Sequence, residues 1–241
     1  LNFYECSDCG LYARYPMPSE SELNSIYSEC YSEENITSNI TNQLSPVDLY
    51  ESLGNFINQN FFTEKKVIKI LDYGSGTGGL LKELKHYGNS SNDVLEGIEY
   101  SKSARVEANK NFGDDVFHKT IPNKKYQLIT MIEVIEHLTQ PWIDLDLILS
   151  HMEKNGELLI TTPNLGGLNA LLTGCNWREQ NKPFHLIMFK KKFLGKLLYD
   201  AGFQHVRFVK FFPVSADIPF QKVKTKILQL FGLHGGICVV A

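Results

Sequence analysis

Residues 70–81 read ILDYGSGTGGLL and contain the end of a strand, a turn and the start of a helix. The apolar run over 67–72 has the composition of a β-strand and leads directly into a turn that is dense in glycine. Leucines at positions 80, 81 and 84 then recur at helical spacing. A strand that runs through a glycine turn into a helix predicts the first unit of an α/β domain.

The glycine turn fits two fingerprints for nucleotide cofactors. Gly74, Gly76 and Gly79 form G-x-G-x-x-G, a pattern typical of dinucleotide sites. Gly74, Gly76 and Gly78 form G-x-G-x-G, and Asp72 precedes this pattern by two residues. The glycines alone therefore leave a dehydrogenase open as one interpretation.

Strand and helix patterns alternate on both sides of this turn. The further predicted strands cover 93–99, 116–119, 126–133, 156–163, 205–212 and 236–241. The predicted helices cover 46–62, 78–87, a segment capped by Ser101, 140–153, 189–203 and 219–231. Continuous apolar runs suit strands buried on both faces, so we expect a doubly wound α/β domain over 46–241. Residues 1–45 show no long periodic segment.

The bulk properties are those of an ordinary globular chain. The 24 Lys and Arg against 27 Asp and Glu give a net charge of −3, which provides no general attraction to nucleic acid. The apolar stretch 227–241 is too short and too interrupted to span a bilayer. No secretory signal is visible and the five cysteines are irregularly spaced, which predicts a cytoplasmic protein. The chain starts at Leu1 rather than Met, as a truncated sequence would.

Two acids indicate which cofactor the turn accepts. Glu99 ends the next predicted strand, where a carboxylate takes two ribose hydroxyls, although a plain surface acid is the alternative. A buried Asp72 would repel the pyrophosphate of a dinucleotide but attract an ammonium and a sulfonium group. S-adenosylmethionine carries both of these cations and a ribose. The two acids therefore favour S-adenosylmethionine over NAD.

Asp72, Gly74, Gly76 and Gly78 match the D/E-x-G-x-G-x-G motif of class I S-adenosylmethionine-dependent methyltransferases, which the chain resembles over about 46–241. The resemblance implies a Rossmann-like, mostly parallel seven-stranded sheet with helices on both faces. It also implies a set of cofactor-binding residues: Asp72, Gly74, Ser75, Gly76, Gly78, Glu99, Tyr100 and Glu133. The usual Gly-Asp pair after the third strand is absent, so the adenine contact is expected among 119–121.

The segment EVIEHL at 133–138 contains the candidate catalytic residues. In a helical turn, Glu133, Glu136 and His137 stand at i, i+3 and i+4 and share one face. Such a group can hold a divalent ion that lowers the pKa of an acceptor hydroxyl. Alternatively, His137 acts as a general base beside a glutamate. A third interpretation is that Glu136 and His137 only hydrogen-bond backbone groups.

The same segment resembles the E-V-x-E-H stretch of quinone-biosynthesis O-methyltransferases and of small-RNA 2′-O-methyltransferases. In the RNA branch two glutamates and two histidines bind a metal. The resemblance implies a ligand set of Glu133, Glu136, His137 and His185 here. Many relatives carry a similar segment with no established metal, so a divalent metal is an open alternative.

Residues 177–189, WREQNKPFHLIMF, resemble a stretch of a broad bacterial methyltransferase branch. In that branch a tryptophan, a His-Leu pair and an aromatic residue precede a helix that ends in Gly-Phe. The resemblance implies a loop that lies over the acceptor pocket. The alternative is that Trp177 and Phe184 are simply core aromatics.

The N-terminal segment contains C-x-x-C-G, with Cys6 and Cys9. A zinc site of this kind needs four ligands, usually from two such pairs. The segment resembles the second half of a zinc ribbon that precedes the domain in some bacterial sugar C-methyltransferases. This resemblance implies a metal at Cys6 and Cys9 if a second pair lies upstream, and a degenerate remnant otherwise.

Taken together, the residues and the resemblance predict a methyltransferase that modifies a small molecule, such as a sugar, a quinol or a phenol, at oxygen or carbon. An RNA 2′-O-methyltransferase and a non-catalytic cofactor-binding subunit are the alternatives. The slight net acidity counts against nucleic acid. The motifs identify neither the acceptor nor the oligomeric state.

Overall fold

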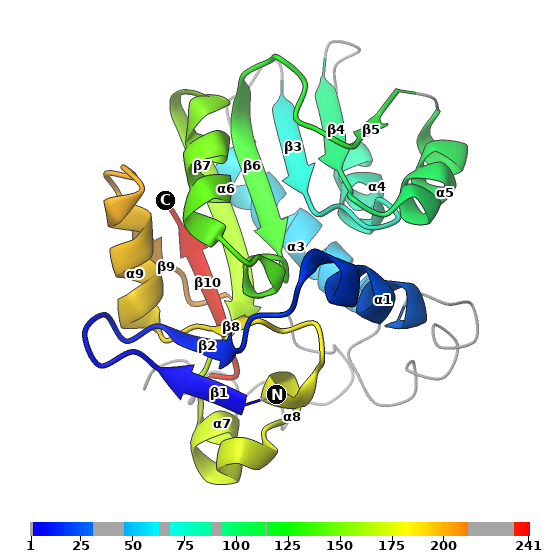
Figure 1. The fold of residues 1–241 in the computed structure, drawn as a ribbon. Coiled ribbons are helices and arrows are strands. Elements are labelled where there is room, and N and C mark those ends of the chain that lie inside the picture. The colour runs from blue at the N-terminus through cyan, green and yellow to red at the C-terminus, as the bar shows by residue number, and fades with distance from the viewer. Residues whose placement is uncertain (1, 31–45, 63–67, 88–92, 114, 212–233) are drawn as a thin grey trace.

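The computed structural model describes residues 2–30, 46–62, 68–87, 93–113, 115–211 and 234–241. Within these ranges the chain forms a seven-stranded sheet with helices on both faces and a separate three-stranded sheet (Figure 1). The predicted Rossmann-like α/β fold is confirmed. The helix expected over 219–231 lies outside the described residues. None of the described helices has the length and apolar character that crossing a membrane requires.

The central sheet has the strand order β5-β4-β3-β6-β7-β10-β9. Its strands are β3 (Lys69–Tyr73), β4 (Val94–Ile98), β5 (Phe117–His118), β6 (Tyr126–Ile132), β7 (Met152–Pro163), β9 (Arg207–Phe208) and β10 (Gly236–Val240). Strands β5 to β7 in this order pair in parallel, and β10 is antiparallel to both its neighbours. The chain leaves β3 to one side through β4 and returns to its other side with β6. The glycine turn therefore follows the strand at which the order reverses, where open parallel sheets bind ligands.

Two apolar cores lie on opposite faces of this sheet. On one face pack the helices α3 (Pro46–Phe61), α4 (Gly79–Lys85) and α5 (Lys102–Phe112). On the other face pack α6 (Pro141–Ser150) and α9 (Lys191–Asp200). Neighbouring strand residues alternate between the cores: Ile70 belongs to the first and Leu71 to the second. This double burial explains why the strands read as continuous apolar runs rather than as alternating patterns.

Several element boundaries differ from the sequence predictions. The Ser101 hydroxyl accepts a hydrogen bond from the Ala104 amide and caps α5, as expected. Strand β7 begins at Met152, four residues earlier than predicted, because Met152 pairs with Tyr126 across a register shift. The strand predicted over 205–212 shortens to the two residues of β9, which pair with the end of β10.

Residues before the central domain form regular elements that the periodicity did not reveal. They are β1 (Asn2–Glu5), β2 (Tyr12–Tyr15) and α1 (Glu20–Cys30). The two strands are too short for a clear period, and α1 is mostly polar. Strand β2 pairs with β8 (Ile187–Met188), so the β1–β2 hairpin extends a sheet made with a distant part of the chain.

The hairpin lies beyond the carboxyl ends of the central strands, together with α7 (Leu168–Thr173) and α8 (Arg178–Asn181) (Figure 1). Phe3 and Tyr12 of the hairpin pack against a small core that includes Trp177 and Met188. The N-terminal residues therefore contribute to the end of the sheet where ligands are expected.

Candidate functional site

A cavity of about 2370 Å³ opens at the carboxyl ends of β3, β4 and β6. Its walls include the glycine turn at Gly74 and Gly76, the acid Glu99, and the loop residues Phe184 and His185. Pockets for single small ligands usually occupy about 300–1,000 Å³. The cavity therefore has room for two ligands.

The glycine turn requires glycine for two different reasons. Gly74, Gly76 and Gly78 all have positive φ angles, of 81°, 53° and 83°. A Cβ atom on Gly74 would lie 2.4 Å from a methyl carbon of Val134, so packing excludes a side chain there. A Cβ atom on Gly76 would meet nothing within 4 Å, and Gly76 lines the cavity. The backbone at Gly76 is thus open to close approach by a ligand.

Glu99 lies next to this open backbone. Its two carboxylate oxygens accept hydrogen bonds from the Gly76 amide at 2.9 Å and from the Ser101 amide at 2.7 Å. A carboxylate offers about four lone-pair sites, so two remain for ligand hydroxyls. The structure thus brings together the glycine turn and the second-strand acid, as the sequence predicted.

Asp72 and Ser75 lie beneath the turn rather than in the cavity wall. The Asp72 carboxylate is buried and accepts a hydrogen bond from the Thr130 hydroxyl at 2.7 Å. Burial raises the pKa of Asp72 to about 7, and the Thr130 hydroxyl opposes this shift. The buried Ser75 donates its amide hydrogen to the Ile98 carbonyl. Ser75 therefore holds the turn to the end of β4, and Asp72 joins the end of β3 to Thr130 of β6.

Tyr100 and Lys119 line the cavity together with Glu99. The Lys119 ammonium lies 5.3 Å from the centre of the Tyr100 ring. Of the positions 119–121 at which the adenine was expected, only Lys119 reaches the cavity. Arg105 of α5, which sequence reasoning missed, donates to the carbonyls of Glu99 and Tyr100 at 2.5 and 2.7 Å.

The EVIEHL segment folds differently from the predicted continuous helical turn over 133–138. A 3₁₀ helix covers only Ile135–His137, and Glu133 precedes it with a left-handed φ of 55°. The amide of Glu133 still donates to the Thr161 carbonyl of β7, so this residue stays with the sheet. Glu133 lines the cavity but does not join Glu136 and His137 in one ligand cluster. The expected single face of three residues is wrong in this respect.

Glu136 is completely buried. One carboxylate oxygen accepts a hydrogen bond from the Thr162 hydroxyl at 2.9 Å. The other oxygen has no hydrogen-bond partner and lies 3.8 Å from Nε2 of His137. Burial, followed by the charge of Glu133, raises the pKa of Glu136 well above its ordinary value. An orphaned carboxylate oxygen in this position is suited to a cation or a proton donor.

The ring of His137 makes backbone hydrogen bonds to Phe184 and to Glu133. Nδ1 lies 3.1 Å from the Phe184 carbonyl, which can only accept, so in this bond Nδ1 carries the hydrogen. In that tautomer of the neutral ring, Nε2 has the lone pair. Burial lowers the pKa of His137 to about 4, so the ring is uncharged at neutral pH. His137 also stacks on Phe184 with ring centres 5.3 Å apart.

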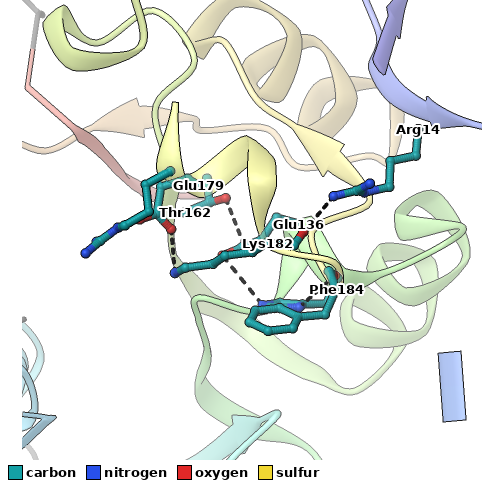
Figure 2. A network of polar contacts seen from close by, with 8 residues as sticks. Arg14, Glu136, Thr162, Glu179, Lys182 and Phe184 are labelled. Carbon is teal, nitrogen blue, oxygen red and sulfur yellow. Dashed lines mark hydrogen bonds and ion pairs between the residues drawn. The ribbon is translucent and has the colours of Figure 1, made fainter. Parts of the chain in front are cut away.

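His185 completes a cluster with Glu136 and His137. Its ring meets that of His137 edge-on at 4.9 Å, and it is only 2% exposed. Nδ1 of His185 is buried without a hydrogen-bond partner, and burial followed by the charges of His137 and Lys182 lowers its pKa to about 2. One ligand atom from each of the three residues lies within 4.8 Å of the others. Figure 2 shows the network of polar contacts around Glu136.

Residues of the loop over 177–186 line the cavity, and the expectation that this loop covers the acceptor stays a prediction. Lys182 and Glu179 form an ion pair at 2.5 Å and both line the cavity (Figure 2). Trp177 is buried in the small core with Met188 and also borders the cavity, so the core interpretation describes part of its role.

A tyrosine–aspartate pair in the cavity wall was missed by sequence reasoning. The Tyr73 hydroxyl donates to Asp144 of α6 at 2.5 Å, and both residues line the cavity. Tyr73 stands between Asp72 and Gly74 in the motif. Alternation along β3 points its side chain to the face opposite Asp72, which was the available signal.

Cys6 and Cys9 lie in the turn of the β1–β2 hairpin. Both thiols are exposed and free. The turn is closed by the Gly10 amide, which donates to the Cys6 carbonyl. Within the described ranges the cysteine pair forms no group of three potential ligands at metal-ligand spacing, whereas Glu136, His137 and His185 do.

The comparisons with known proteins agree with this geometry. The sequence profile of a methyltransferase domain family matches residues 48–207. No curated protein matches the chain in sequence.

Solved structures share the fold at low sequence identity. A Thermotoga maritima protein described as a possible histamine N-methyltransferase has a TM-score of 0.60 at 15% identity, covering 90% of this chain and 98% of its own. The plantazolicin methyltransferase BpumL, in complex with a triazolic desmethylplantazolicin analogue and S-adenosylhomocysteine, has a TM-score of 0.60 at 16% identity, covering 92% and 98%. A chain from the complex of the Haloferax volcanii Trm112 activator with a methyltransferase has a TM-score of 0.58 at 14% identity, covering 80% and 89%.

Proposed function

The chain belongs to the methyltransferase domain family, and on this premise we propose that it methylates a small molecule, such as a sugar, a quinol or a phenol, at oxygen or carbon. Its cofactor is S-adenosylmethionine. When bound, this cofactor supplies a methyl group on a positively charged sulfur. The work left to the protein is to bind both ligands, align them and exclude water.

The observation that carries this proposal is the pairing of Glu99 with the open backbone at Gly76. The carboxylate is held by the Gly76 and Ser101 amides and keeps acceptor sites for two ribose hydroxyls. The positive φ of Gly76 leaves space where a ligand can lie against the chain. Tyr100 and Lys119 extend this wall on the adenosine side. We assign Asp72, Gly74, Ser75 and Gly78 to support of the turn.

On the acceptor side, we assign to His137 the removal of a proton from the acceptor. Its Nδ1–H donates to the Phe184 carbonyl, so Nε2 is the nitrogen that accepts the proton. Burial lowers the pKa of the ring to about 4, which keeps it uncharged but weakens it as a base, so a negative charge beside Nε2 is needed to favour proton transfer. The carboxylate of Glu136 lies 3.8 Å from this nitrogen and, when it is ionised, would stabilise the positive charge that His137 gains. Glu133 lines the cavity and precedes Val134, which packs against Gly74, and we assign it to contact with cofactor and acceptor.

Calorimetric titration tests the cofactor assignment. S-adenosylhomocysteine is expected to bind the wild-type protein at least 100-fold more tightly than NAD, because the negative charge of an ionised Asp72 behind the glycine turn would repel the pyrophosphate of NAD. Gly76→Ala should weaken S-adenosylhomocysteine binding by about tenfold, since its methyl group fills the space next to the ligand.

Gly113→Ala is the matched control for that titration. Gly113 also has a positive φ, of 103°, and open space around it, but it ends α5 and does not line the cavity. Gly113, with φ 103° and ψ 161°, has a backbone that essentially only glycine adopts, so this control carries at least as much strain as Gly76→Ala but removes no ligand contact. Tight binding of NAD together with absent binding of S-adenosylhomocysteine would refute the proposed function.

As the alternative to a base at His137, we propose that Glu136, His137 and His185 bind a divalent metal, in which case Nε2 of His137 would hold the ion instead of taking the proton. The residues fit this role because the buried Glu136 oxygen and Nδ1 of His185 both lack hydrogen-bond partners and are suited to zinc or cobalt. A bound ion would lower the pKa of an acceptor hydroxyl. Three protein ligands would leave a position for that hydroxyl.

The metal assignment predicts a loss of Co²⁺ binding in two variants. Glu136→Gln and His185→Gln should each weaken binding at least tenfold, measured by the visible absorption of the bound ion. The double variant Cys6→Ser, Cys9→Ser is the control, and it should bind Co²⁺ as the wild type does. Binding that is lost in the cysteine variant and kept in His185→Gln would place the metal at the hairpin instead.

A second candidate acceptor is the 2′-hydroxyl of an RNA. The cluster of Glu136, His137 and His185 favours it, since a metal there would activate any hydroxyl. The net charge of −3 counts against it, because RNA binding rests largely on phosphate contacts. A screen of sugar nucleotides, quinols, phenols and short RNAs with a radiolabelled methyl donor distinguishes these classes. A non-catalytic subunit would bind cofactor and label none of them.

A further inference from the structure

Arg14 of the N-terminal hairpin reaches into the loop that borders the cavity. It is 7% exposed, and its guanidinium hydrogen bonds go to backbone carbonyls of that loop. Nε donates to His185 at 2.6 Å, and one terminal nitrogen donates to Lys182 at 2.7 Å and Gln180 at 3.1 Å. Figure 2 shows Arg14 entering the network from the hairpin side.

The burial of the Arg14 guanidinium has to be compensated by specific contacts. A charged group taken out of water is costly unless hydrogen bonds replace its hydration, and burial lowers the pKa of Arg14. Three carbonyls supply the replacement. They come from Gln180 and Lys182 at the end of α8 and from His185 of the His-Leu pair, so one planar guanidinium bridges both ends of this part of the loop.

The loop that Arg14 spans holds side chains of the acceptor side. Phe184 stacks on His137, and His185 meets His137 edge-on. The backbone continues the same connection: the Arg14 amide donates to the Leu186 carbonyl, and the Leu186 amide donates to the Glu136 carbonyl. Consecutive backbone hydrogen bonds therefore link the hairpin to the loop and the loop to the EVIEHL segment.

We propose that Arg14 is a positioning residue that fixes the loop over 177–186, so that Phe184 and His185 stand against His137. This inference rests on the proposed function for its meaning in the reaction. Arg14 lies outside the segment 48–207 that the methyltransferase profile matches. The N-terminal hairpin is then part of the acceptor side of the site rather than a separate appendage.

Hydrogen exchange of the variant Arg14→Met tests the proposal, because methionine has a comparable length but no donors. The amides of His185 and Leu186, which donate to Lys182 and Glu136, should exchange at least tenfold faster than in the wild type. Arg14→Lys should give an intermediate rate, since one ammonium cannot reach all three carbonyls. Arg207→Met, which removes an exposed partner of Glu157, is the control.

Fluorescence supplies a second signal. The chain has two tryptophans, and Trp142→Phe leaves Trp177 of the loop as the only tryptophan, which can be excited selectively over the tyrosines. Trp177 is buried against the hairpin, so Arg14→Met in this background should shift its emission to longer wavelength. Affinity for S-adenosylhomocysteine should stay within twofold of wild type. With an acceptor from the screen, kcat should fall at least tenfold while KM for the methyl donor stays within twofold.

Two results would overturn the role of Arg14. One is unchanged exchange at His185 and Leu186. The other is faster exchange throughout β3 and β6 as well, which would make Arg14 a general stabilising residue. A wild-type protein that fails to bind S-adenosylhomocysteine would refute the proposed function, while the exchange rates would still decide whether Arg14 holds the loop.

Discussion

Glu99→Ala is expected to weaken S-adenosylhomocysteine binding by about 100-fold or more. A hydrogen bond to a charged group contributes roughly 1.5–3 kcal/mol, and the ribose would make two with this carboxylate. Two such bonds at the lower end amount to about 3 kcal/mol, which corresponds to a factor above 100 in affinity. The variant also removes the acceptor for the Gly76 and Ser101 amides, which loosens the turn. Titration calorimetry measures the change directly.

Two further variants separate these contributions. Glu99→Gln keeps the shape and one acceptor oxygen, so an intermediate loss of about tenfold is expected. Glu107→Ala removes an exposed acid from α5 and should leave binding unchanged. An affinity of Glu99→Ala within threefold of wild type would remove Glu99 from ribose binding.

His137→Gln should lower the rate of methyl transfer by about 100-fold or more. Proton transfer by a positioned side chain contributes about 10²–10⁴ to the rate. Glutamine keeps a donor that can reach the Phe184 carbonyl but offers no basic nitrogen. The rate is measured with a radiolabelled methyl donor and an acceptor found in the screen.

His205→Gln is the control for this variant, because His205 is exposed and does not line the cavity. S-adenosylhomocysteine should bind His137→Gln within twofold of wild type, which shows that the cofactor side is intact. Transfer by His137→Gln at a rate within threefold of wild type would exclude His137 as the base.

The central fold was predictable because its signals are local. The glycine turn after β3, the Ser101 cap and the apolar runs of β6 and β7 each show in a few neighbouring residues. Short or polar elements were not predicted, since the four-residue strands of the hairpin are too short to show a period in hydrophobicity. The start of β7 was misplaced because it depends on pairing with Tyr126, which is not encoded locally.

The candidate site was likewise predictable only in part. Gly76 and Glu99 follow neighbouring parallel strands, and parallel strands bring their carboxyl ends to one edge of a sheet. Their proximity therefore followed from the sequence. The left-handed conformation of Glu133 could not be predicted from the sequence, because it depends on a hydrogen bond from the Glu133 amide to Thr161 of the distant strand β7. This single backbone angle separates Glu133 from the cluster that the one-dimensional spacing had suggested.

The sequence by itself determined the Rossmann-like fold and the glycine turn that borders the cavity, because motif, strand and helix are contiguous there. The resemblance had also grouped His185 with Glu136 and His137, and the structure brings these three residues together. Only the tertiary structure brought Arg14 to the carbonyl of His185, 171 positions away. This contact depends on how separate segments pack, and no pattern of neighbouring residues records that packing.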